Sequence, residues 1–144
     1  MTARVQTAPF DLATEVDGFG TGAGAIVTFT GVVRDDTGLM AALDIEHYPG
    51  MTERALQDYG QQAADRFGLT DWRIIHRHGH IPVGDTIMMV ATAARHRHAA
   101  FQGADYLMDW LKSRAPFWKR EIAQDGTATW VDAKSTDEVS LNRW

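Results

Sequence analysis

The stretch LKSRAPFWKRE, residues 111–121, joins a predicted helix to a predicted strand. The strongest helical period of the chain lies upstream of it, in Ala100, Phe101, Ala104, Leu107, Met108 and Leu111. Pro116 ends that helix, because a proline pushes the residue before it toward extended geometry. Downstream, FWKREI and TATWVDAK are separated by AQDG, a pattern typical of a β-hairpin. The segment therefore predicts a long helix that turns sharply into an antiparallel pair of strands.

The rest of the chain shows the same mixture of strands and helices. Strands are predicted at AIVTFTGVV (25–33), ALDIEHY (42–48), DWRIIHRHGHI (71–81) and DTIMMVATAA (85–94), because these runs are rich in β-branched residues. Apolar residues four apart between Met51 and Phe67 predict a helix that ends at Gly68. The glycine-rich DGFGTGAGA (17–25) precedes a strand rather than a helix, so it is interpreted as a loop and not as a dinucleotide fingerprint. The order predicts an α+β fold with mostly antiparallel strands.

Length and composition limit the class of protein. A chain of 144 residues with 44% hydrophobic and 23% charged residues predicts a single domain, residues 1–144, with a real core. A net charge of −5 argues against general nucleic-acid binding. No apolar run approaches the roughly 18–20 residues that span a bilayer. The opening MTARVQTAPFDLATEV lacks a signal-peptide pattern, so we expect a cytoplasmic protein with no membrane association.

The chain contains no cysteine. That excludes disulfides, thiolate metal sites and cysteine nucleophiles. Any sulfur chemistry would therefore use sulfur that another molecule carries in.

Cations and aromatic residues gather around Pro116 although the protein is acidic. The chain has only three lysines, and Lys112 and Lys119 flank this proline. Clustering of the two ammonium groups and partial burial beside Phe117 and Trp118 would lower the lysine pKa values. A lysine brought toward neutral pH can act as an acid, a base or a nucleophile. The alternative is that both are ordinary helix-end cations that the helix dipole favours.

A second candidate site lies in ARHRH, residues 94–98, at the predicted start of the long helix. Free N–H groups at a helix start attract anions, and His96 and Arg97 add positive charge there. The alternative is a pair of solvated surface cations. Arg34 ends a predicted strand and would be a further ligand for a phosphate or carboxylate in a cation-rich pocket.

A third pattern, HRHGH, places His76, His78 and His80 at a period of two on one predicted strand face. Imidazoles at this spacing can bind zinc. No adjacent carboxylate completes a familiar metal-ligand spacing, so histidines on a strand edge without a metal are the alternative.

Five stretches together resemble one known family. They are VTFTGVVRD, LDIEHYPGMTE, IIHRHGHIPVGD, ARHRHAAF and LMDWLKSRAPFWKRE, and the resemblance runs from about Gly24 to Val131. Their sequences and their order along the chain resemble those of the large, catalytic subunit of molybdopterin synthase, the MoaE family. The sequence departs from common family motifs in three places. Ala94-Arg95 stands before His96 where the family often has a serine-containing pair, Val32 stands where some members have a lysine, and Lys134 stands where an arginine is frequent.

The resemblance implies an α/β hammerhead fold and a homodimer. A small ubiquitin-like sulfur-carrier subunit would dock on each end to form a heterotetramer, with its C-terminal Gly-Gly thiocarboxylate in a pocket of the large subunit. There it would give sulfur to cyclic pyranopterin monophosphate, and two transfers would form the dithiolene of molybdopterin. No cofactor or metal is implied.

The resemblance also implies roles for individual residues. Lys112 and Lys119 match the essential lysines, with Lys119 our first choice for the direct catalytic role. Three residues match the substrate-binding set: Arg34, His96 and Arg97. Four more fall in motif positions near the site: Phe29, Met108, Pro116 and Glu121. Two other functions stay open at this point, a non-catalytic docking module for an acidic carrier tail and a histidine-based zinc hydrolase.

Overall fold

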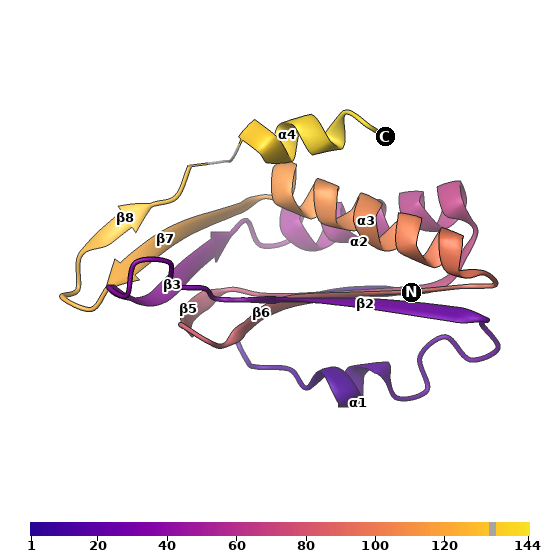
Figure 1. Ribbon diagram of the computed structural model, residues 1–144, viewed down its shortest axis with the longest axis horizontal. Helices are drawn as coiled ribbons and strands as arrows, with labels where there is room; N and C mark the ends of the chain where they lie inside the picture. The colour runs from indigo at the N-terminus through magenta and orange to yellow at the C-terminus, as the bar shows by residue number, and fades with distance from the viewer. Residues whose placement is uncertain (133–134) are drawn as a thin grey trace.

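The computed structural model describes residues 1–132 and 135–144, so Lys134 lies outside the described residues. Two four-stranded sheets form the framework (Figure 1). The main sheet contains, in spatial order, β1 (Thr2–Gln6), β4 (Leu69–Arg77), β6 (Thr86–Ala94) and β2 (Ala25–Val32). The second sheet contains β5 (Gly79–Pro82), β3 (Met40–His47), β7 (Phe117–Ala123) and β8 (Ala128–Trp130). All pairs are antiparallel except β1 with β4.

Helices cover both faces of the main sheet. Figure 1 shows α2 (Met51–Phe67) and α3 (Arg97–Ser113) side by side on one face and the short α1 (Leu12–Val16) on the other. The larger core lies under α2 and α3, where Trp72, Ile74 and Leu107 are fully buried. Gly60 of α2 allows close contact with the sheet, because a Cβ there would lie 2.4 Å from the Trp72 ring.

The second sheet extends from the end of the main sheet as an arm (Figure 1). Its inner face packs through Val33, Ile45 and Ile81, which are almost fully buried. The short α4 (Ser135–Leu141) follows β8 and returns the chain to α3. There Arg143 and Trp144 donate hydrogen bonds to the carboxylate of Asp109.

The α+β class and the mostly antiparallel strands that the sequence predicts are confirmed. The predicted order lacked β1, α1 and α4. The prediction of one strand over 71–81 was wrong. The strand breaks after Arg77, and Gly79, at a φ of 84° that a side chain would disfavour, redirects the chain from the main sheet into the arm. No helix within the described ranges is long and apolar enough to cross a membrane.

Candidate functional site

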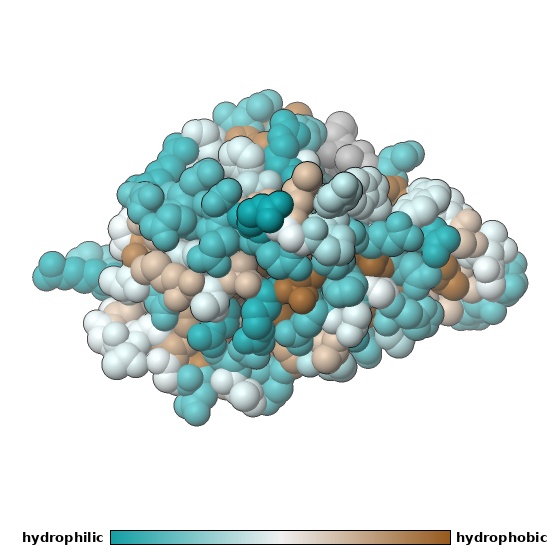
Figure 2. All heavy atoms as spheres, turned by 180° about the vertical axis from the view of Figure 1, so that it is seen from behind, coloured by the Kyte–Doolittle hydropathy of each residue, from teal (hydrophilic) through white to brown (hydrophobic). Residues whose placement is uncertain are grey.

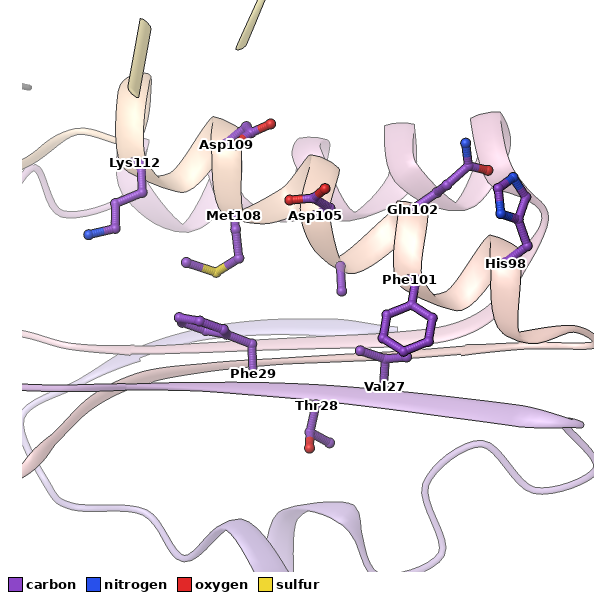
Figure 3. A pocket seen from close by; sticks show the side chains of 11 residues that line it. Val27, Thr28, Phe29, His98, Phe101, Gln102, Asp105, Met108, Asp109 and Lys112 are labelled. Atoms are coloured by element: carbon purple, nitrogen blue, oxygen red, sulfur yellow. The ribbon is translucent and has the colours of Figure 1, made fainter. Parts of the chain in front are cut away.

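An open apolar groove runs between the edge strand β2 and helix α3. Its volume is about 660 Å³, and its lining includes Val27, Phe29, His98, Phe101, Met108 and Lys112. Figure 3 shows Phe29 rising from β2 toward Met108, with Lys112 at one end of the groove and His98 at the other. Phe29 is 42% exposed and Phe101 is 61% exposed, so the groove offers apolar surface to a bound molecule. Figure 2 shows the molecule's opposite side, where apolar residues are scattered among polar ones.

The turn at Pro116 connects the lysine-bearing end of α3 to β7. The helix ends at Ser113, and the N–H of Arg114 donates to the carbonyl of Trp110 at 2.8 Å. The N–H of Phe117 then donates to the carbonyl of Ala115 at 2.8 Å, which closes a three-residue turn around the proline. The predicted end of the helix at this proline is confirmed.

Alternation along β7 decides which side chains accompany Lys119. Lys119 pairs with the buried Ile45 of β3 and shares the inner face of the arm with Phe117. Trp118 lies on the opposite face and is 50% exposed. The predicted partial burial of Lys119 beside both Phe117 and Trp118 was therefore wrong for Trp118, because neighbouring strand residues point to opposite faces.

His76, at the end of β4, is the residue on which the site converges. Its side chain is 4% exposed and its ring stacks on Phe117 with 3.8 Å between centroids. Burial lowers its pKa to about 3, the hydrogen bond to the Arg77 carbonyl opposes that shift, and the charges of Lys119 and Lys112 lower the pKa further. Both lysines therefore lie within electrostatic reach of one buried imidazole, which supports the predicted convergence.

Strand register places His76 on the same face of the main sheet as Phe29 of the groove. His76 pairs with Met88 of β6, and Met88 pairs with Gly31 of β2. Phe29 of the groove lies two residues before Gly31 on the same face of β2. The imidazole therefore lies about one side-chain repeat, roughly 7 Å, along the strands and two strand spacings, roughly 10 Å, across the sheet from Phe29.

The three histidines of HRHGH do not form one face. The His78 ring lies 4.3 Å from that of His47, and burial and then the charge of His47 lower the pKa of His78. His80 belongs to β5 and contacts the carboxylate of Asp44 at 3.0 Å. Among the residues that the structure describes, no group of histidines and carboxylates is placed to hold a metal. The geometry contradicts the spacing on which the zinc hypothesis rested.

The predicted anion ligands lie apart from the lysines within one chain. His96 occupies the N-cap position of α3 without a side-chain capping bond and Arg97 is the first helical residue, as the sequence predicts, and both side chains are exposed. At a rise of about 1.5 Å per residue, Arg97 and Lys112 are roughly 22 Å apart along this helix. Arg34 is exposed just beyond β2 and forms a 2.8 Å ion pair with Asp36. Glu121 of β7 lies at a separate small hollow beside Thr129 and Leu39.

Comparison with known proteins identifies the family. The MoaE protein family matches residues 5–114, more than half of the chain. The chain belongs to the MoaE family. A molybdopterin synthase catalytic subunit of Cereibacter sphaeroides is 54% identical over 147 residues, and the match covers 100% of both chains.

Solved structures agree with this assignment. A molybdopterin biosynthesis MoaE protein from Burkholderia ambifaria MC40-6 superposes with a TM-score of 0.84 at 46% identity, over 99% of this chain and 97% of that one. A complex of subunits 1 and 2 of molybdopterin-converting factor from Helicobacter pylori 26695 shares the fold, with a TM-score of 0.79 at 17% identity over 92% of each chain. The family and fold predicted from the sequence are confirmed.

Of the site residues that the sequence predicted, this MoaE fold brings four close together and leaves the anion ligands apart from them. Lys112, Phe29 and Met108 line the groove, and Lys119 lies near Lys112 through their shared neighbour His76. Sequence reasoning missed the burial of His76 near the lysines, because its pattern with His78 and His80 suggested a metal site. The available signal was its position next to Ile74 and Ile75 in an apolar run, which indicates burial.

Proposed function

We propose that this MoaE protein is the catalytic subunit of a molybdopterin synthase. It transfers sulfur from the C-terminal Gly-Gly thiocarboxylate of a small ubiquitin-like carrier subunit to cyclic pyranopterin monophosphate, and two transfers complete the dithiolene. The observation that carries the proposal is that Lys119 and the exposed Lys112 both lie close enough to the buried His76 to lower its pKa, with Lys112 lining an apolar groove. The name and 54% identity of the Cereibacter relative support it.

The site chemistry suits an anionic donor and an anionic substrate. A thiocarboxylate and a phosphate both bind best to cationic hydrogen-bond donors. Lys112 lies at the mouth of the groove, where it would hold the carrier tail, and Lys119 would act as an acid-base or transient covalent group. Since the chain has no cysteine, it has no thiol to hold the sulfur between donor and substrate.

A homodimer would unite the two cation groups. The groove lies along β2, an edge strand of the main sheet, beside the exposed Phe101. A second copy packed across it with the α3 helices antiparallel would bring its own His96 and Arg97 to the Lys112 end. The separation of about 22 Å within one chain supports this arrangement. The complete substrate site would then contain residues of two chains, with a carrier subunit at each end of the dimer.

A mixed-dimer experiment tests the shared site. Chains carrying Lys112→Ala are co-expressed with chains carrying Arg97→Ala, and molybdopterin formation is measured with thiocarboxylated carrier and pyranopterin monophosphate. Random pairing makes about half of the dimers mixed, and each mixed dimer has one complete site of two, so activity recovers to about a quarter of wild type. Each variant alone serves as the control. Absence of recovery in dimers that do form would show that the cation groups do not share a site.

Substrate affinity separates the roles of the two groups. Arg97→Ala should weaken binding of the pterin phosphate by about 1.5–3 kcal/mol, the range for a hydrogen bond to a charged group. Carrier affinity should change little, because docking of a protein subunit rests on a much larger interface. Calorimetry with each ligand measures both. Unchanged substrate affinity together with lost carrier affinity would contradict the assignment.

A further inference from the structure

The groups around His76 differ from those expected of a structural core histidine. The ring contacts Phe117 of β7. The charged or titratable groups that influence it lie on three elements besides its own strand β4: Lys119 on β7, Lys112 on α3 and His47 on β3. Arg77 follows it on β4, but the Arg77 guanidinium turns to the other face of the sheet and donates to the carbonyls of Thr7 and Thr86.

The hydrogen bond of His76 determines its tautomer. Nδ1 lies 2.7 Å from the carbonyl oxygen of Arg77, and a carbonyl only accepts, so Nδ1 carries the proton. Nε2 of the neutral ring therefore keeps its lone pair. With the ring held by this bond at one edge and by the Phe117 stack on one face, the direction of that lone pair is fixed.

We infer that His76 is a positioning residue for the lysine pair: its anchored neutral imidazole offers Nε2 as a hydrogen-bond acceptor to an ammonium group, of Lys119 in the first place. Two lysines at one site repel each other, and a neutral acceptor favours the ammonium form of one of them without cancelling the positive charge. A carboxylate at this place would instead form an ion pair and compete with the anionic ligands. The inference rests on the proposed function, in which Lys119 does the chemistry.

The chain allows a direct test because it has only three lysines, Lys112, Lys119 and Lys134. In protein labelled with ¹³C-lysine, three side-chain Cε signals report the three protonation midpoints, assigned by single Lys→Arg variants. The test compares wild type with His76→Phe, which keeps the stack but has no nitrogen, and His76→Gln, which can place an acceptor near the position of Nε2. Lys134 in the same spectra shows whether the pH scale is unchanged.

The expected result has a defined sign. An acceptor favours the charged amine, so its loss in His76→Phe should lower the midpoint of Lys119 by at least about 0.5 pH unit, and His76→Gln should restore most of it. Single-turnover sulfur transfer at neutral pH should fall about tenfold in His76→Phe, because the Lys119 amine is no longer held in position, with carrier affinity unchanged. If His76→Phe does not fold, His76→Asn replaces it, because Asn keeps the donor to the Arg77 carbonyl without the acceptor at Nε2.

Unmoved midpoints of both Lys112 and Lys119 in a folded variant would overturn the inference. An equal loss of turnover in His76→Phe and His76→Gln would also overturn it, because both variants lack the ring and would be equally impaired if its role were only structural. Failure of the proposed function is a separate observation: the wild-type protein would then transfer no sulfur in the same assay, whatever the midpoints do.

Discussion

Acid should destabilise this protein through His76 more than through any exposed histidine. The pKa of His76 is lowered from its ordinary value of 6.5 to about 3, chiefly by burial. As the pH falls, the unfolded chain binds the proton first, so this group's contribution to stability is complete above pH 6.5 and is lost as the pH falls toward 3. Between pH 7.5 and pH 5 the loss at His76 is about 2 kcal/mol, from 1.36 kcal/mol for each pH unit below 6.5. This is a large part of the 5–15 kcal/mol typical of a domain.

Urea unfolding measures this effect, with the fluorescence of the five tryptophans as the signal. The free energy of unfolding is determined at pH 7.5 and pH 5 for wild type and for His76→Gln, which cannot titrate. His78, whose pKa is also lowered, is present in both proteins and cancels in the comparison. The loss on acidification should be about 2 kcal/mol smaller in His76→Gln. Equal losses in the two proteins would refute the assignment of a buried, neutral imidazole.

Substitutions at three further positions test the site and its supports. Lys119→Ala should reduce single-turnover sulfur transfer at least about a hundredfold while carrier binding stays intact. Lys119→Arg should rescue little, because a guanidinium keeps its charge but does not give up its proton at working pH. Near-normal rates in Lys119→Arg would mean that Lys119 only binds an anion. Gly60→Ala should lower the free energy of unfolding in urea by about 1–3 kcal/mol although alanine has the better helix propensity, since the new Cβ would lie 2.4 Å from the buried Trp72 ring. An unchanged unfolding midpoint would show that α2 can shift to make room. Asp109→Ala should lower the free energy of unfolding by about 2 kcal/mol and release Trp144, whose indole donates to this carboxylate. Proteolysis of the C-terminus measures the release. Unchanged protection would mean that the ring contacts with Phe67 and Tyr106 hold Trp144 in place.

Strong local patterns in the sequence predicted the central elements correctly. The apolar period from Ala100 to Leu111 became α3, and Pro116 ended it because of its effect on the preceding backbone. The elements that were missed are short or lie near the ends: β1, α1 and α4. The five residues of α1 contain no fully buried side chain, so their apolar pattern is too weak to predict a helix.

The errors at the site came from arrangement in space. The HRHGH period was read as one strand face, but one residue with positive φ, Gly79, sends the chain into the second sheet and separates His80 from His76. Trp118 and Lys119 are neighbours in sequence and point to opposite faces of β7. Proximity in a sequence therefore predicted the right residue types, while sheet membership decided which of them meet.

The charge balance of the lysine site gives a physical reason for a histidine there. Lys112 forms no ion pair with any residue of the described part of the chain, and the acidic side chains nearest to it on α3 are engaged elsewhere, Asp109 with Arg143 and Trp144. A buried, neutral His76 adds no negative charge that would satisfy the lysines in advance. An incoming carboxylate or thiocarboxylate would therefore meet no negative charge at the position of His76. In a His76→Asp variant, a carboxylate beside the lysines should weaken binding of the anionic carrier tail at neutral pH. A carrier without its last two glycines serves as the control: it does not reach the lysines, so it should bind His76→Asp and wild type equally well. Equal affinity of both proteins for the full-length carrier would mean that the tail does not sense this charge.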